Sequence, residues 1–232
     1  MTKLTFFPGW GYSAEVMRLL ATELQDEFVV QLESLPDFDA DDFTARAASR
    51  IADDSWLVGW SLGGMLAALL ADHLQERCAG LILLGCNRVF VRRTDWQHAM
   101  APADFSAFKA ALIQQPQQSL QRFAMLCSQG AVQPRQTVQQ LRSHLFAANN
   151  PGLRSGLQQL EQLDIRNALH GFGGRKLVLF ALDDALVPPQ VMQQLSAMAL
   201  PQTSLQQVPG CHAFVVEHAA QLAAYIRRFV MQ

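Results

Sequence analysis

One short stretch decides the fold of this chain: Gly59-Trp60-Ser61-Leu62-Gly63-Gly64. It follows an apolar run at residues 56–58 and leads into a helical run rich in alanine and leucine at residues 65–74. The pattern G-x-S-x-G between a strand and a helix is typical of a sharp turn that holds the serine hydroxyl clear of the sheet. Glycine is needed around the serine because a Cβ there would collide with the neighbouring strand and helix. The helix N-terminus suits a developing negative charge, so we predict that Ser61 is a nucleophile.

The composition predicts one folded domain and excludes several classes of protein. The chain has 232 residues, of which 50% are hydrophobic, so it can bury a large core and still carry an inserted segment. Its net charge of −2 provides no basic field for nucleic acid. No apolar run has the roughly 18 residues of a membrane span, and the N-terminus does not resemble a secretory signal. We therefore expect a cytoplasmic monomer with no nucleic-acid or membrane partner.

The cysteines predict neither a metal site nor a disulfide framework. Cys78, Cys86, Cys127 and Cys211 show no C-x-x-C or metal-ligand spacing, which indicates reduced thiols. Cys211 stands beside His212, and we interpret it as a small buried residue rather than a nucleophile. No metal or other cofactor is expected.

Apolar runs alternate with helical patterns along most of the chain, which predicts an α/β fold: a mostly parallel sheet with helices on both faces. The strand at 80–84 is wholly apolar, as expected for one buried on both faces, whereas the strand at 204–208 alternates and is predicted at an edge. The predicted strands are residues 4–7, 28–32, 56–58, 80–84, 176–180 and 204–208. The predicted core helices are residues 14–24, 41–51, 65–74 and 219–230.

The segment 92–169 differs from the rest of the chain. It contains no convincing strand, and Gln, Ala, Leu and Phe recur in it at helical spacing between proline breaks. We predict several short helices that form a lid inserted between the fourth and fifth strands of a core made of residues 1–91 and 170–232. Ligands bind at the carboxyl ends of strands in such sheets, so the lid is expected to shape the substrate cavity.

A nucleophilic serine needs a base, and the base needs an orienting acid. In the α/β-hydrolase fold, which this pattern predicts, these residues follow the serine in the order Asp or Glu, then His. The strand at 176–180 leads into Asp183 and Asp184; we favour Asp184 because D-x-x-V-P is common in this fold, with Asp183 as the alternative. Of the six histidines, only His212 follows the last strand through a tight break, so it is the predicted base.

These residues predict acyl transfer in two steps. His212 takes the proton from Ser61 as the hydroxyl attacks a carbonyl, and Asp184 stabilises the imidazolium. Water activated by the same histidine then releases the acid. Two backbone amides are expected to form the oxyanion hole: that of Leu62, after the nucleophile, and that of Trp10, in the glycine-containing loop after the first strand.

Several motifs together resemble one particular family. Gly9-Trp10-Gly11, the serine turn, Asp184-Ala185-Leu186-Val187-Pro188 and His212-Ala213 resemble the pimeloyl-acyl-carrier-protein methyl ester esterases of biotin synthesis (BioH type), over nearly the whole chain. The resemblance implies a cytosolic α/β-hydrolase with a helical lid. It also implies that the substrate is a pimeloyl methyl ester carried by acyl carrier protein. Pro8 departs from the family, which often has His at that position.

The resemblance also implies roles for individual residues. Trp10 and Trp60 would flank the acyl chain, and the lid stretch 121–127 would place Phe123 against it. The implied substrate-binding residues are Trp10, Trp60, Ser61, Leu62, Phe123, Cys127 and His212. The implied contacts with the acidic carrier are Arg122, Arg135 and Arg142, since arginine suits bidentate contact with carboxylate and phosphate.

Two other functions are compatible with the same residues. A general short-chain carboxylesterase or thioesterase would use the same triad, because chain-length preference depends on how the lid packs. A non-hydrolytic binding protein on the same fold is a third hypothesis, since fold alone does not establish activity. The intact set of Ser, Asp and His argues against a pure binder.

Overall fold

A six-stranded, wholly parallel sheet forms the centre of the computed structural model, which describes all 232 residues. The strand order is β2-β1-β3-β4-β5-β6, so that β2 and β6 are the edges and the prediction for 204–208 is confirmed. The strands are β1 (Lys3–Phe7), β2 (Val29–Leu32), β3 (Ser55–Trp60), β4 (Cys78–Leu84), β5 (Lys176–Ala181) and β6 (Thr203–Val208). The α/β fold read from the sequence is therefore confirmed.

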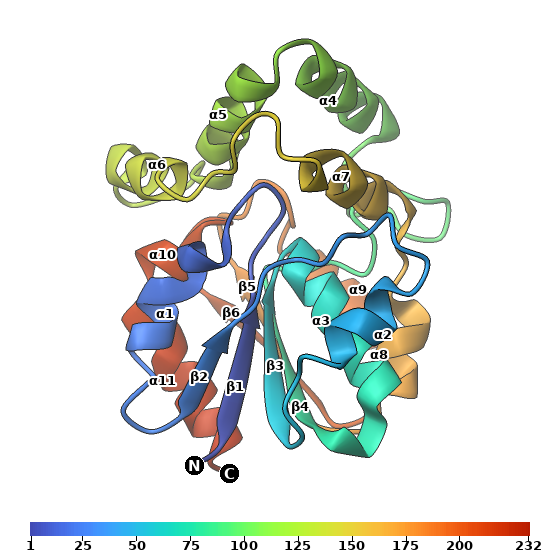
Figure 1. Cartoon of the computed structure of the whole chain (residues 1–232), viewed down its shortest axis with the longest axis vertical. Coiled ribbons are helices and arrows are strands. Elements are labelled where there is room, and N and C mark those ends of the chain that lie inside the picture. Colours follow the sequence, from blue (N-terminus) through green and yellow to red (C-terminus); the bar gives the residue numbers. More distant parts are fainter.

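Helices cover both faces of the sheet (Figure 1). One face carries α2 (Phe43–Ala48), α3 (Leu62–Leu74) and α8 (Arg166–Gly171), with α3 in contact with the other two. The other face carries α1 (Arg18–Thr22), α10 (Phe214–Glu217) and α11 (Ala219–Val230). The remaining core elements are the 3-10 turns η1 (Ala14–Met17) and η2 (Gln75–Arg77) and the helix α9 (Val191–Ala197). The central strands β3 and β5 are buried along their whole length, which explains their continuous apolar sequence.

The helix boundaries differ from the predictions at several ends. The predicted helix 14–24 is divided into η1 and α1, and the helix predicted at 41–51 is limited to α2. The helix predicted from residue 65 begins at Leu62, immediately after Ser61. Its first turn is glycine-rich, and the close contact of those glycines with β3 favours the helix there despite their low helix propensity.

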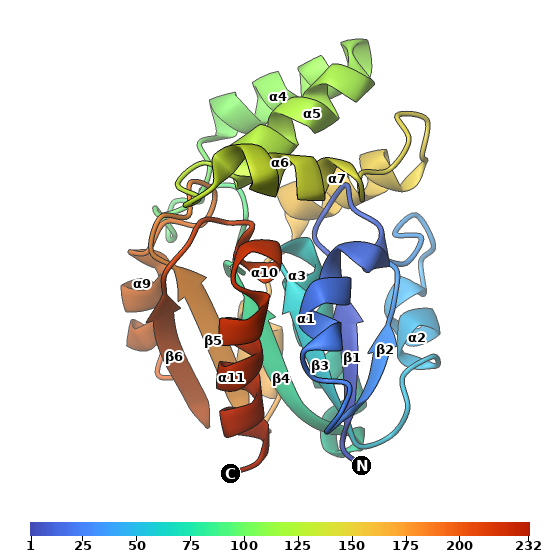
Figure 2. The ribbon, with the colours of Figure 1, turned by 90° about the vertical axis from the view of Figure 1, so that its left-hand side faces the viewer.

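Four helices form a layer over the carboxyl ends of the strands (Figures 1 and 2). They are α4 (Pro102–Gln114), α5 (Pro116–Cys127), α6 (Pro134–Arg142) and α7 (Gly152–Gln162), and we call this layer the lid. Three of them begin with proline, which lacks the N–H that a first helical turn leaves unpaired. The prolines that looked like breaks in the sequence are thus helix starts. Helix α8 begins within the segment 92–169 but packs against α3 beside the sheet. No helix in the structure has the length and hydropathy needed to cross a lipid bilayer.

An ionic cluster ties the two ends of the lid segment together. The buried guanidinium of Arg88, just after β4, donates hydrogen bonds of 2.9 and 2.8 Å to Asp164 and one of 2.8 Å to Asp95. It also lies over the ring of Trp96, 4.7 Å from the centroid. Burial alone would lower the pKa of Arg88, but the hydrogen bonds to the two carboxylates raise it. The cation therefore stays charged and holds both lid ends to the core.

Arg88→Gln should lower the free energy of unfolding by about 2 kcal/mol, because it removes charge-assisted hydrogen bonds made by a buried group. Urea unfolding measures the change. Arg77→Gln is the matched control: the Arg77–Asp53 pair is exposed on both sides, and such pairs contribute about 0–1 kcal/mol. Equal losses in the two variants would contradict the assigned role of Arg88.

Candidate active site

Ser61 stands on a strained turn between β3 and α3. Its φ is 55° and its ψ is −121°, a conformation that L-residues rarely adopt. A Cβ at Gly59 would lie 2.2 Å from the Gly63 carbonyl oxygen, and a Cβ at Gly63 would lie 2.4 Å from that of Pro8. Only glycine permits these approaches, and they bring the start of α3 against the ends of β1 and β3. The Ser61 amide donates a 3.0 Å hydrogen bond to Leu84 at the end of β4, which fixes the turn to the sheet.

Asp184 follows β5 and is buried beside His212. One carboxylate oxygen, Oδ1, accepts hydrogen bonds of 2.8 Å from the amides of Leu186 and Val187. The other, Oδ2, lies 2.8 Å from His212 Nδ1. The structure thus places Asp184 against the histidine, whereas Asp183 is exposed to solvent. The two amide donors after Asp184 explain why D-x-x-V-P is a useful pattern: the loop turns back on the carboxylate and fixes its orientation.

His212 follows β6 and is fully buried. Because Nδ1 faces a carboxylate, the proton belongs on Nδ1 and the lone pair on Nε2, the arrangement that a general base needs. Nε2 has no hydrogen-bond partner, so no hydrogen bond joins it to Ser61 Oγ. Such catalytic hydrogen bonds are often long before substrate binds and tighten in the complex. Both residues neighbour the end of β4: a Cβ at Gly85 would lie 3.4 Å from His212 Nδ1, and the preceding residue, Leu84, accepts the hydrogen bond from the Ser61 amide.

The two amides predicted for an oxyanion hole are free to donate. Leu62 is the first residue of α3, where backbone N–H groups have no intrahelical acceptor. The amide of Trp10 makes no hydrogen bond within the protein. Ser61 itself is only 7% exposed, so a carbonyl bound beside these donors would be shielded from water.

An apolar cavity of about 150 Å³ lies between the lid and the core. Trp10 and Phe123 line it, with their rings edge to face at 5.0 Å between centroids. The other lining residues are Phe90, Met100, Asp104, Phe108, Leu126, Leu157 and Leu160. Sequence reasoning missed most of this lining, because apolar residues at helical spacing in the lid cannot be told from ordinary core residues. The usable signals were the motif around Trp10 and the stretch around Phe123.

The structure separates Trp60 and Cys127 from this cavity. The indole of Trp60 is fully buried and donates a 2.9 Å hydrogen bond to the carbonyl of His212. Its ring packs against that of Tyr12, 5.2 Å away. Of the predicted substrate-binding residues, Trp10 and Phe123 line the cavity, and the lining does not include Trp60, Ser61, Leu62, Cys127 or His212. The contact of Trp60 with the acyl chain stays a prediction.

The cysteine next to His212 is not equipped as a nucleophile. Burial raises the pKa of the Cys211 thiol to about 12, so the reactive thiolate is scarce at neutral pH. All four cysteines are buried and free. No group of three or more His, Cys, Asp or Glu side chains could hold a metal ion.

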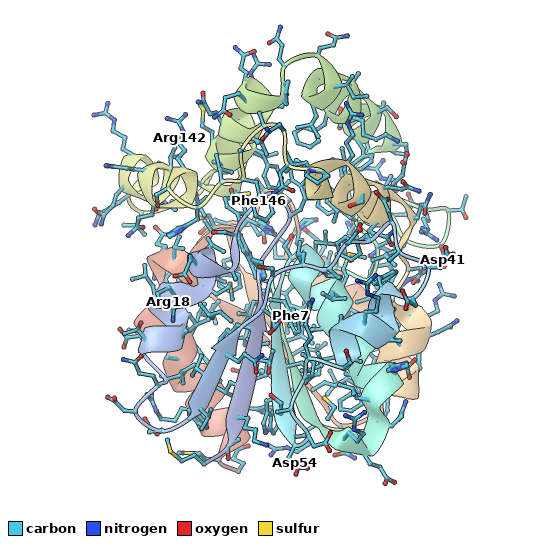
Figure 3. All side chains as sticks on the ribbon, in the orientation of Figure 1. Phe7, Arg18, Asp41, Asp54, Arg142 and Phe146 are labelled. Atoms are coloured by element: carbon cyan, nitrogen blue, oxygen red, sulfur yellow. The ribbon has the colours of Figure 1, made fainter.

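The three arginines proposed for carrier contact lie on the outside of the lid. Arg122 is on α5, while Arg135 and Arg142 are on the neighbouring α6, and all three are exposed. None forms an ion pair within the protein. Figure 3 shows Arg142 on the outer side of the lid, above the core. These cations are thus available to an external anionic surface.

Comparison with known proteins decides the family. The α/β-hydrolase fold family matches residues 8–219. The chain belongs to the α/β-hydrolase family. Within it, a pimeloyl-[acyl-carrier protein] methyl ester esterase from Stenotrophomonas maltophilia (strain R551-3) is 33% identical over 239 residues, covering 98% of this chain and 92% of that protein. This relative places the chain among the esterases of this type and confirms the resemblance.

A second relative is the biotin biosynthesis bifunctional protein BioHC from Cellvibrio japonicus (strain Ueda107), 35% identical over 204 residues. That alignment covers 84% of this chain and 41% of the bifunctional protein. Among solved structures, a hydrolase from Oleispira antarctica has a TM-score of 0.81 at 13% identity and covers all of this chain and 92% of its own. An esterase from Exiguobacterium antarcticum has a TM-score of 0.80 at 14% identity and the same coverage. These structures support the fold, and with the relatives they make this protein a serine esterase of the α/β-hydrolase family.

Asp184→Asn should lower kcat for a small ester by about 10⁴-fold, because the histidine loses the acceptor that fixes its tautomer. Asp183→Asn is the control, since its side chain is exposed and should change kcat by less than about twofold. Steady-state hydrolysis of p-nitrophenyl acetate measures both. If the larger loss followed the change at Asp183, the assignment of the acid would be wrong.

Proposed function

We propose that this protein hydrolyses the methyl ester of a pimeloyl chain held on acyl carrier protein, with Ser61 as nucleophile, His212 as base and Asp184 as orienting acid. One observation carries the proposal. The Asp184–His212 pair, bonded at 2.8 Å, is almost completely shielded from solvent and leaves Nε2 as the free ring nitrogen at the sheet end that carries Ser61. A buried histidine whose Nδ1 is held by a carboxylate and whose Nε2 is free, at the end of the sheet that carries a serine turn, has the form of an acyl-transfer site.

The first half of the reaction forms an acyl-enzyme. His212 Nε2 takes the proton of Ser61 as Oγ attacks the ester carbonyl, and Asp184 stabilises the imidazolium that forms. The oxyanion accepts hydrogen bonds from the amides of Trp10 and Leu62. Each such donor typically lowers the barrier by about 2.7–4 kcal/mol. His212 then protonates the departing methoxide, and methanol leaves.

The second half returns the enzyme to its starting state. Water occupies the position that methanol vacated and loses a proton to His212 Nε2 as it attacks the acyl carbonyl. The same two amides stabilise the second oxyanion. Collapse of this intermediate releases the free carboxylic acid, and the proton returns from His212 to Ser61 Oγ.

The substrate class follows from the cavity, the lid surface and the relatives. A narrow apolar cavity lined by Trp10 and Phe123 suits a methylene chain, and its volume of about 150 Å³ leaves a carrier protein outside. Arg122, Arg135 and Arg142 offer exposed cations to the acidic carrier and to the phosphate of its phosphopantetheine arm. The relatives' names state the same substrate. The proposal includes action as a monomer in the cytoplasm, where four free cysteines stay reduced.

Growth without biotin tests the proposed substrate. In a bacterium that lacks its own pimeloyl methyl ester esterase, this gene should restore growth, because the ester must be cleaved before the chain can be used. Ser61→Ala at equal soluble expression should not restore it, since the nucleophile is gone while the fold remains. Failure of the wild type, with p-nitrophenyl acetate still hydrolysed, would point to a general short-chain esterase or thioesterase instead.

Charge reversal on the lid tests the carrier contact. Arg122→Glu with Arg135→Glu should lower kcat/KM for the carrier-bound ester by about 10-fold or more, because opposite charges then become like charges. The same variant should hydrolyse a small free ester at the wild-type rate. Arg46→Glu with Arg228→Glu is the control: it makes the same change in net charge at exposed positions on α2 and α11. An equal loss in both double variants, or on both substrates, would exclude the contact.

A further inference from the structure

The loop between β1 and η1 is bonded to the lid. We call residues 8–13 the oxyanion loop, since it carries Trp10. Tyr12 forms an antiparallel bridge with Leu145, in the connection between α6 and α7. Two main-chain hydrogen bonds of 2.9 Å flank the bridge: Ser13 donates to His144, and Phe146 donates to Gly11. Figure 2 shows this segment rising from β1 to the lower edge of the lid, and Figure 3 shows Phe146 between lid and core.

A third hydrogen bond joins the lid to Trp10 itself. The buried indole Nε1–H donates a 2.9 Å bond to the carbonyl of Leu153, in the first turn of α7. Helix α7 also approaches the proposed oxyanion donors directly through Gly156. A Cβ at Gly156 would lie 2.9 Å from Trp10 Cδ1 and 3.4 Å from Leu62 Cδ2. One helix of the lid therefore touches both residues whose amides are proposed to bind the oxyanion.

We propose that the lid holds the oxyanion hole in its working geometry, with the Trp10 indole as the positioning side chain and Gly156 as the residue that permits the close approach. The inference rests on the proposed function, in which the Trp10 amide is an oxyanion donor. Oxyanion donors act only within a narrow range of about 2.7–3.1 Å. The oxyanion loop contains Gly9 and Gly11, so its own backbone is permissive and needs external bonds to stay fixed.

The same coupling reaches the histidine loop. The amide of Ala213, next to His212, donates a 3.0 Å hydrogen bond to the carbonyl of Cys127 at the end of α5. Helix α5 carries Arg122, one of the proposed carrier contacts. A carrier docked on the lid would thus contact the layer that contains α5 and α7. Helix α7 is bonded to the oxyanion loop, and α5 is bonded to the histidine loop. In this account the lid is part of the catalytic apparatus and not only a cover for the acyl chain.

Trp10→Phe tests the coupling, because it keeps the main-chain amide and an aromatic ring but removes the indole N–H. With p-nitrophenyl acetate, whose acetyl group is too short to need the acyl cavity, kcat should fall by about 10- to 100-fold, the size of effect that a displacement near 1 Å produces. KM should stay within about twofold. Trp56→Phe is the control, since it also replaces a buried indole by a smaller ring, at a position in β3 that packs against Phe229 of α11 rather than against the lid.

Gly156→Ala tests the same contact without changing Trp10. The added Cβ would lie 2.9 Å from Trp10 Cδ1, so α7 must shift away from Trp10, and kcat should fall by about 10-fold in protein that is still folded at the assay temperature. Gly173→Ala is the control, because nothing lies within 4 Å of its Cβ position. A purely structural role predicts changes in stability with kcat unchanged.

The outcomes separate this inference from the proposed function. Wild-type kcat in both Trp10→Phe and Gly156→Ala, with hydrolysis still dependent on Ser61, would overturn the inference and leave the esterase proposal standing. An equal loss in Trp56→Phe, or a rise in KM alone, would also overturn it. A wild-type protein that hydrolyses no ester would instead overturn the proposed function.

Discussion

The contact between the ends of β1 and β3 and the start of α3 is the constraint on which the rest of the site depends. Gly59 and Gly63 allow backbones to approach within distances that any Cβ would prevent, and this approach forces Ser61 to a φ of 55°. Backbone strain of this kind costs about 1–3 kcal/mol and persists only where the surroundings over-determine it. Here the strained turn brings the Ser61 hydroxyl and the free amide of Leu62 together at the start of α3. The loops that follow the other strands lie at the same end of the sheet.

In the proposed mechanism, the buried Asp184–His212 pair supplies the base for Ser61. In the low dielectric of the interior, a hydrogen bond is stronger than in water, and a buried polar group without a partner raises the free energy of the folded state. Asp184 is satisfied on both oxygens, by two amides and by the imidazole, while the carbonyl of His212 accepts from Trp60. Within this pair of side chains only Nε2 is left without a partner, and it is the nitrogen that the proposed chemistry uses. The lid adds a second layer of control, because its hydrogen bonds reach the oxyanion loop and the histidine loop together.

The features that could be predicted from the sequence are those that depend on short stretches of the chain and on their order. The parallel sheet followed from apolar runs between helical patterns, and the turn at Ser61 followed from a glycine pattern that stands between a predicted strand and a predicted helix. The pairing of Asp184 with His212 followed from the chain order of the fold, although only the structure shows that Asp183 faces solvent. The ends of short helices such as α1 and α2 could not be predicted, because tertiary packing rather than propensity decides where they stop.

Other features depend on contacts between residues far apart in the chain, which no local pattern encodes. The lining of the cavity by Phe108 and Leu157 looks in the sequence like ordinary helix packing. The indole of Trp10 is hydrogen-bonded to a residue 143 positions away, and that of Trp60 to one 152 positions away.

The most direct test of the central claim is mass spectrometry of the protein after reaction with a fluorophosphonate, which phosphonylates activated serines. The account predicts a single adduct, on Ser61, that forms in the wild type and not in His212→Ala. Labelling of another residue, or equal labelling of Ser61 without His212, would contradict it.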